Sequence, residues 1–107
     1  RVLLALGAPG DLFLLHYAER LLTDPEARLT ILDATGLTQR DPSFRNGAQR
    51  LSQVGPDRVA LLLHRSVDGS VLIEQDLLLT SYKGWSRAAE QRAPWLEHVP
   101  STLILRP

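Results

Sequence analysis

The 107-residue sequence contains no cysteine and no methionine, and its 12 basic residues are balanced by 12 acidic residues. The lack of cysteine excludes disulfides and thiolate metal sites, and it agrees with a reducing compartment such as the cytoplasm. The zero net charge gives no electrostatic footprint for nucleic acid, since nucleic-acid-binding domains usually carry an excess of Lys and Arg. No apolar run reaches the roughly 18 residues of a membrane span, and no signal peptide is present. We therefore expect a cytoplasmic chain with no membrane span and no nucleic-acid partner.

The missing methionine also bears on the extent of the chain. Arg1 directly precedes an apolar run, whereas a natural start would carry an initiator methionine. We therefore expect residues 1–107 to be one domain, either excised from a longer protein or a chain from which a disordered start has been removed. Hydrophobic residues make up 44% of the chain, too many for a disordered segment. This length is enough for a single domain with one core.

Five apolar runs of strand length alternate with segments of helical spacing. The runs span residues 2–6, 28–34, 58–64, 77–81 and 102–106, and the helical segments span 12–22, 42–53 and 86–98, the last of which Pro94 disturbs. Continuous apolar runs are typical of strands that are covered on both faces. Their alternation with helices predicts an α/β fold, with an open, mostly parallel five-stranded sheet and helices on both faces.

Residues 65–75 allow two interpretations. The Asp68–Gly69 pair between short apolar stretches is a hairpin signal. The same letters fit a short crossover in which residues 70–75 form about two helical turns. Parallel strands need a connection of about a dozen residues, and this segment is just long enough. A hairpin here would contradict the parallel sheet.

Three aspartates stand at the ends of predicted elements. Asp11 follows the turn "GAPG" and is expected to cap the helix that begins at residue 12. Asp41 precedes Pro42, which is typical of a helix cap followed by the first helical position. Asp33 ends the second strand, where it stands either in a solvated turn or at the crevice above the sheet.

The tail of the chain, "DLLLTSYKGWSRAAEQRAPWLEHVPSTLILRP", resembles the C-terminal half of a universal stress protein domain. In that family an Asp-led apolar strand enters a Gly-rich loop, and a helix, a Pro-containing break and a final apolar strand follow. The segments "VLLAL", "LFLLHYAERLL" and "ARLTILDA" are similar to the family's first strand, first helix and second strand. The resemblance implies a Rossmann-like α/β fold over most of the chain.

A narrower resemblance concerns residues 16–34, "HYAERLLTDPEARLTILDA". They are similar to the cytoplasmic regulatory tails of cation:proton antiporters, which carry degenerate domains of the same kind. This resemblance implies a membrane transport domain in the same polypeptide, with the present segment attached to the inner face of the membrane. It leaves the transported ion and the sensed signal unnamed.

The motif that binds ATP in the stress protein family is largely missing. Members that bind ATP carry Gly-x2-Gly-x9-Gly-Ser/Thr after the fourth strand, because glycines let backbone N–H groups approach phosphates. Here Thr80 takes the first glycine position and the second falls near Lys83, while the motif's end falls at Ala93, Pro94 and Trp95. The family's Asp after the first strand is replaced by Leu6 or Gly7. We therefore expect no ATP cofactor.

A different nucleotide in the same crevice stays an open alternative, because ligands of open α/β sheets gather at the carboxyl ends of the strands. The strand ends and the loop that follows the fourth strand supply the candidates. These predicted crevice residues are Gly7, Asp33, Thr80, Ser81, Lys83 and Gly84.

The last strand is predicted to form a homodimer. It is short, apolar and at the end of the chain, and an unprotected apolar edge would otherwise invite aggregation. In the family that it resembles, this strand pairs across a dimer. The predicted edge residues are Ser101, Thr102, Leu103, Ile104, Leu105 and Arg106.

The sequence contains no constellation that is typical of an enzyme or of a metal site. No Ser stands in a nucleophile elbow, and the three histidines, His16, His64 and His98, lack the spacing of metal ligands. We therefore predict a non-catalytic, dimeric regulatory domain of a cation:proton antiporter with a degenerate nucleotide site. The alternative is a stand-alone universal stress-type protein that binds a small nucleotide.

Overall fold

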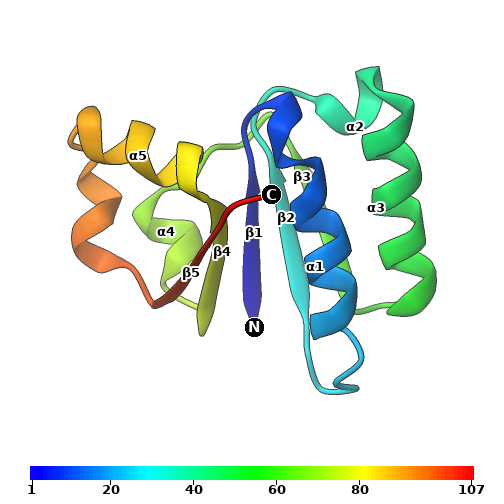
Figure 1. Cartoon of the computed structure of the whole chain (residues 1–107). Coiled ribbons are helices and arrows are strands. Elements are labelled where there is room, and N and C mark those ends of the chain that lie inside the picture. The colour runs from blue at the N-terminus through cyan, green and yellow to red at the C-terminus, as the bar shows by residue number, and fades with distance from the viewer.

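A computed structural model describes all residues from 1 to 107, and it contains one sheet of five strands that all run parallel. The strand order is β3-β2-β1-β4-β5 (Figure 1). The strands are β1 (Val2–Leu6), β2 (Leu29–Asp33), β3 (Val59–Leu63), β4 (Leu77–Ser81) and β5 (Ser101–Leu105). This arrangement confirms the predicted open parallel sheet.

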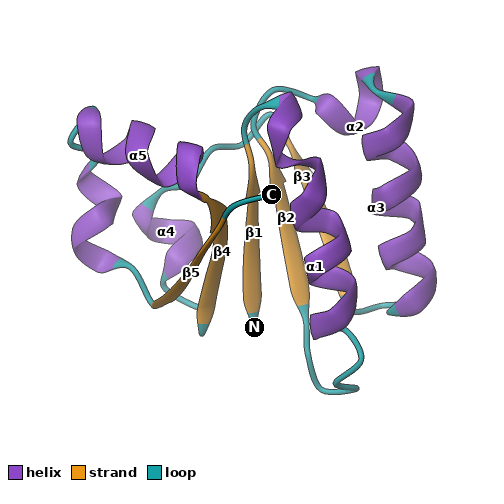
Figure 2. Ribbon diagram, in the orientation of Figure 1, coloured by secondary structure: helices purple, strands orange, loops and turns teal.

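Helices cover both faces of the sheet, as predicted. On one face lie α1 (Phe13–Leu21) and α3 (Pro42–Val54), and on the other lie α4 (Gly69–Leu72) and α5 (Tyr82–Glu90) (Figure 2). The change of face follows from right-handed crossovers, because the chain reverses its direction across the sheet after β3. The remaining elements are the short α2 (Leu37–Arg40) and two 3-10 helices, η1 (Pro9–Leu12) and η2 (Pro94–His98). No helix is both long enough and apolar enough to cross a membrane.

The ambiguous segment 65–75 is a crossover and not a hairpin. It contains the single-turn helix α4, which Asp68 caps by accepting hydrogen bonds from the Val71 N–H at 3.0 Å and the Ser70 hydroxyl at 2.6 Å. Such caps satisfy backbone donors that a helix leaves unpaired. Since β4 pairs parallel to β1, the short crossover is sufficient to return the chain across the sheet.

The sheet separates a large core from a small one. The large core joins β1 and β2 to α1 and α3 through Leu4, Leu14, Ile31, Phe44 and other apolar residues. The small core contains four buried residues, which are Leu3, Leu32, Leu72 and Leu78. Each fully buried leucine contributes about 1.5–3 kcal/mol. The α4–α5 face is therefore the less filled face of the sheet.

The helix predicted over residues 86–98 is wrong at its start, whereas the predicted disturbance at Pro94 is confirmed. Helix α5 begins at Tyr82, directly after β4, because the Ser81 hydroxyl caps it and accepts a hydrogen bond from the Gly84 N–H at 3.0 Å. The helix ends at Glu90, and Pro94 begins the separate turn η2, since proline lacks the N–H that a continuing helix needs. The polar stretch after β4 is thus the first turn of a helix and not a loop.

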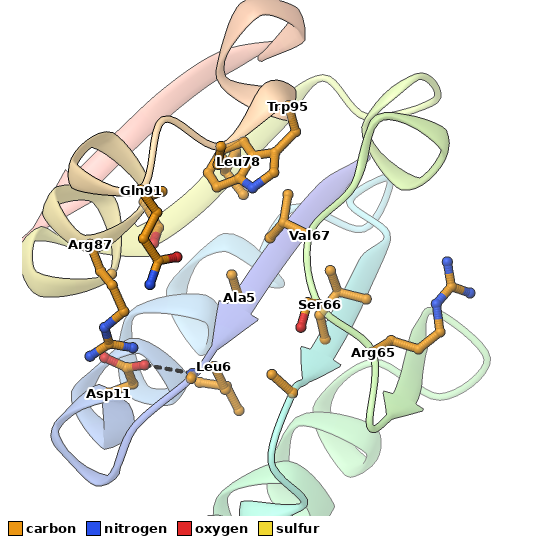
Figure 3. Close-up of a pocket in the computed structure, with 17 residues that line it drawn as sticks. Ala5, Leu6, Asp11, Arg65, Ser66, Val67, Leu78, Arg87, Gln91 and Trp95 are labelled. Atoms are coloured by element: carbon orange, nitrogen blue, oxygen red, sulfur yellow. Dashed lines mark hydrogen bonds between the residues drawn. The ribbon is translucent and has the colours of Figure 1, made fainter.

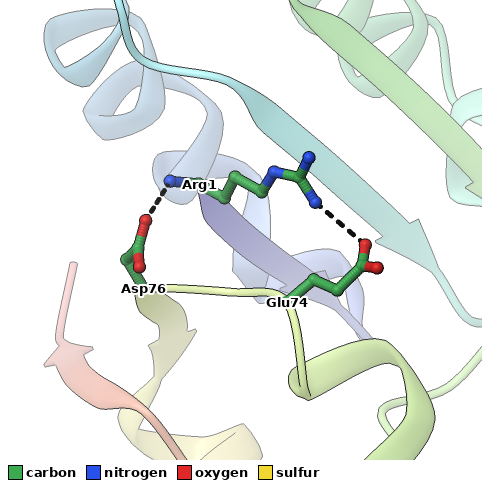
Figure 4. A network of polar contacts seen from close by, with 3 residues as sticks. All are labelled: Arg1, Glu74 and Asp76. Atoms are coloured by element: carbon green, nitrogen blue, oxygen red, sulfur yellow. Dashed lines mark hydrogen bonds and ion pairs between the residues drawn. The ribbon is translucent and has the colours of Figure 1, made fainter.

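At the amino end of the sheet, Arg1 links the first strand to the start of β4. Its amino group donates to Asp76 at 2.7 Å and its guanidinium contacts Glu74 at 2.9 Å (Figure 4). The hydrogen bond and the charge of this amino group lower the pKa of Asp76. All three side chains are exposed, so water screens these pairs and they stabilise the fold little.

Strands β3 and β5 form the two edges of the sheet. β5 pairs only with β4, so its outer backbone groups are unpaired and Ile104 is 38% exposed. The edge that the dimer prediction requires is therefore available, and dimerisation itself stays a prediction. At the opposite edge Leu61 is 41% exposed and Leu63 is 36% exposed.

Candidate functional site

A cavity of about 180 Å³ lies at the carboxyl ends of β1 and β4. The chain leaves β1 toward the α1 face and leaves β4 toward the α5 face, so the segments that follow these neighbouring strands diverge. This divergence is the topological switch point of an open α/β sheet, where such folds place their ligands. The cavity is on the α4–α5 face, which carries the smaller core.

The cavity has an apolar end and a polar end. Trp95 lies near Leu78 and Val67 at one end, and Arg87 and Asp11 face each other at the other end (Figure 3). Gln91 extends from α5 between these two ends. A site of this kind offers apolar contact to a ring and polar contact to a charged group.

Trp95 is held in place by a second tryptophan. The rings of Trp85 and Trp95 meet edge to face, with centroids 6.1 Å apart and planes at 73°. This geometry is favourable because the positive edge of one ring meets the negative face of the other. The apolar end of the cavity is therefore a fixed wall.

Thr80 provides an unpartnered polar group in the cavity wall. Its residue surface is only 6% exposed, and its hydroxyl makes no hydrogen bond within the chain. Gly84 packs closely against it, since a methyl group on Gly84 would lie 3.2 Å from both the Thr80 and the Ser81 hydroxyl oxygens. The fully buried side-chain polar atom without a partner is Gln75 Oε1 and not the Thr80 oxygen, so the Thr80 hydroxyl is open to the cavity and available to a ligand.

Arg87 stands at the mouth of the cavity, and its side chain forms no ion pair or hydrogen bond. Across Gly7, a methyl group on that glycine would lie 3.8 Å from Nη1 of Arg87 and 3.9 Å from Oδ2 of Asp11. The guanidinium is thus close to the carboxylate without pairing with it. A planar guanidinium with free donors suits a carboxylate or phosphate.

Asp11 does not cap α1 as predicted, and it instead accepts a hydrogen bond from the N-cap of the 3-10 helix η1. It lies within η1, 6% exposed, and its Oδ2 accepts hydrogen bonds from the N–H groups of Gly7 at 2.7 Å and Ala8 at 3.1 Å. The prediction fails because the segment after β1 folds into a 3-10 turn. This turn brings the carboxylate back to the start of the segment, and α1 begins two residues later at Phe13.

Asp33, a predicted crevice residue, does not line the cavity. It is fully buried between β2 and α2, where it accepts hydrogen bonds from the Leu37 N–H at 2.8 Å, the Thr38 N–H at 2.9 Å and the Thr38 hydroxyl at 2.6 Å. Burial raises the pKa of Asp33, but the hydrogen bonds from Thr38 and its neighbours outweigh burial and lower the pKa below 3.8. Asp33 therefore caps the first turn of α2, and this role explains its position.

The other predicted crevice residues divide between two places. Gly7, Thr80 and Gly84 line the cavity. Ser81 and Lys83 line the adjoining groove on the other side of the first turn of α5, which Gly84 also borders. The structure therefore brings together three of the six predicted residues in one cavity.

Sequence reasoning missed Asp11, Arg87, Gln91 and Trp95 as cavity residues. A signal for two of them was present, because positions 84, 87, 88 and 91 share one face of a helix. That face combines the small Gly84 and Ala88 with the polar Arg87 and Gln91. Small residues on a helix face leave room between the helix and the sheet, and polar residues there point to a ligand.

Backbone donors at this edge of the sheet are already occupied by side chains of the chain itself. Asp11 takes the N–H groups of Gly7 and Ala8, and Ser81 takes that of Gly84. A phosphate that relied on backbone N–H groups would have to displace them. Recognition of an anion is therefore left mainly to side chains such as Arg87.

No protein-family model matches the chain, and no curated protein matches it. Among solved structures, a universal stress protein in complex with cAMP is similar to it, with a TM-score of 0.63 and 19% sequence identity. The similarity covers 98% of this chain and 94% of that chain. A likeness at this identity shows the fold, so the predicted universal stress protein-like α/β fold is confirmed.

Proposed function

We propose that this domain binds a small nucleotide that carries one phosphate, with the base in the cavity and the phosphate at Arg87. The observation that carries the proposal is the Thr80 hydroxyl, which has no hydrogen-bond partner within the chain and is open to a cavity at the switch point. The unpaired Arg87 stands at the mouth of the same cavity. Perturbed or unpartnered polar groups in a concave site are characteristic of ligand sites.

The volume of the cavity supports a small ligand. About 180 Å³ is less than the roughly 300–1,000 Å³ of pockets that enclose a drug-sized molecule. It is enough for one ring system, which would contact Trp95 and Leu78. The remainder of a nucleotide would extend past the mouth, where Arg87 supplies a positive charge.

The similar solved structure gives independent support. That universal stress protein is in complex with cAMP, which combines one purine base with one phosphate. The fold of the present chain places its cavity where open α/β sheets bind ligands. The function proposed is the binding of this ligand as a signal.

Isothermal titration of the chain with AMP and with cAMP tests the proposal, and Arg87→Gln is the decisive variant. We expect Arg87→Gln to weaken binding by about tenfold, because it removes a charged hydrogen bond to phosphate. Arg20→Gln, which removes an exposed arginine on α1 at a distance from the cavity, is the matched control and leaves affinity unchanged. If neither ligand binds at millimolar concentration, the proposal is wrong.

A regulatory role within a cation:proton antiporter is a second, narrower hypothesis. It rests on the resemblance of residues 16–34 and on the unpaired outer edge of β5, through which two copies could dimerise. The sequence of the complete gene tests the antiporter, which requires about a dozen apolar segments upstream. Light scattering at high concentration tests the dimer, and a monomeric mass would contradict it.

A further inference from the structure

We propose that Asp11 restricts the cavity to ligands with a single phosphate and excludes polyphosphates. The inference rests on the proposed function and names the residue that sets its selectivity. Asp11 is buried, and its carboxylate stands at the polar end of the cavity opposite Arg87 (Figure 3).

Asp11 accepts the backbone hydrogen bonds that a phosphate would otherwise receive in the turn after β1. Successive backbone N–H groups in a turn form a concavity that binds anions. In the turn after β1 these groups belong to Gly7 and Ala8, and both donate to Oδ2 of Asp11, at 2.7 Å and 3.1 Å. The chain thus places a fixed negative charge in the position that a second or third phosphate would need.

A polyphosphate bound with its base in the cavity would extend past Asp11 into the adjoining groove. Asp11, Gly84 and Arg87 line both the cavity and the adjoining groove, which has a volume of about 580 Å³. Lys83 and Arg106 stand in that groove. A chain of phosphates that extends toward these two cations must pass the Asp11 carboxylate.

The charges at the mouth of the cavity, those of Arg87 and Asp11, favour a ligand with one phosphate. Arg87 offsets the charge of one phosphate, and further phosphates meet the negative charge of Asp11. Like charges repel more strongly in a half-buried site than in water, because the effective dielectric constant is lower. Arg65, on the other side of the cavity, is already 3.7 Å from Asp68 and adds little to the balance.

The experiment compares the affinities for AMP and ATP, in the absence of divalent cations, for the unmodified chain and for Asp11→Asn. The asparagine keeps an oxygen that accepts the Gly7 N–H but removes the charge. We expect the unmodified chain to prefer AMP by at least about tenfold, and Asp11→Asn to reduce that preference to about threefold or less. Asp41→Asn removes the same charge from the cap of α3 and is expected to keep the original preference.

Equal affinity of the unmodified chain for AMP and ATP would overturn the inference while leaving the proposed function intact. The same holds if Asp11→Asn folds and keeps the original preference. If Asp11→Asn does not fold, Asp11→Ser provides a second uncharged acceptor for the turn, and the ratio in the unmodified chain still decides. Failure of both nucleotides to bind to either protein would overturn the proposed function and this inference together.

Discussion

At two corners of the sheet a strand passes into a helix beside a buried polar side chain, and the two side chains have opposite surroundings. At the end of β2, Asp33 accepts three hydrogen bonds and touches no cavity. Near the end of β4, Thr80 has no partner and lines a cavity. The first corner is closed by its own backbone, and the second is left open.

The difference indicates what each corner is for. A buried group that is fully satisfied stabilises the fold, because its loss leaves donors without partners. A hydroxyl that opens into a cavity and has no partner within the chain adds nothing to the fold by hydrogen bonding, and it is free to bind a ligand. Substitutions at the two corners should therefore affect different measurements.

Asp33→Asn is expected to cause the largest loss of stability. The amide would turn its NH2 group toward one of the donors from Leu37 and Thr38, so the free energy of unfolding should fall by about 1–3 kcal/mol. Chemical denaturation at neutral pH measures this change. Asp41→Asn, at the exposed cap of α3, is the matched control and should cost less. An equal loss in the two variants would contradict the closed corner.

The same carboxylate makes stability depend on pH. The pKa of Asp33 is lowered in the folded chain, so the folded state favours the charged form more than the unfolded state does. Its contribution is therefore complete above the unfolded pKa of about 3.9 and is lost as the pH falls through the lower folded value. The stability difference between the unmodified chain and Asp33→Asn should narrow below about pH 4.

Thr80→Val is expected to have the opposite effect to Asp33→Asn, with little change in stability and a loss of affinity for AMP. The valine has the same shape, and no hydrogen bond within the chain is lost, so the free energy of unfolding should change by less than about 0.5 kcal/mol. Affinity for AMP should fall by about threefold to tenfold, because a hydrogen bond to the ligand disappears. Thr80→Ser should restore the affinity. Thr30→Val, on β2, is the matched control, and a similar loss there would argue against a direct role for Thr80.

The sequence was sufficient to predict the framework in which these corners lie. Apolar runs at residues 2–6 and 77–81 have the composition of buried parallel strands, and both are central in the sheet. Three of the six predicted crevice residues, Gly7, Thr80 and Gly84, line the cavity. Asp33, Ser81 and Lys83 do not. Element type and parallel pairing follow from the hydrophobic pattern, which a single sequence carries, whereas the strand order was not predicted.

The sequence was not sufficient to distinguish the closed corner from the open one. In both, an apolar strand is followed by polar residues, and the outcome depends on the backbone between strand and helix. Gly36 adopts a φ of 75°, which turns the N–H groups of α2 toward Asp33. A methyl group on Gly36 would lie 2.8 Å from Cε1 of the His64 side chain, and the positive φ at this position favours glycine.

The β4 corner differs because its helix starts at once. Ser81 caps α5 directly, so no intervening residue can turn a donor toward Thr80. Arg87 then reaches the cavity from the second turn of α5, and Gln91 reaches it from the position directly after the helix. The position of α5 over the cavity arises from tertiary packing, which the local sequence pattern does not predict.

Gly84→Ala is expected to change stability little, because two effects oppose each other. Alanine favours a helix by about 1 kcal/mol relative to glycine, but its methyl group would lie 3.2 Å from the Thr80 and Ser81 oxygens. We expect the free energy of unfolding to change by less than about 1 kcal/mol and the affinity for AMP to fall, since the methyl group narrows the cavity. Gly69→Ala, at the start of α4, adds a methyl group in open space and is the control for propensity alone. If Gly84→Ala stabilises the chain as Gly69→Ala does and binds AMP equally well, then the close contact between α5 and Thr80 does not shape the cavity, and the open corner has to be explained without it.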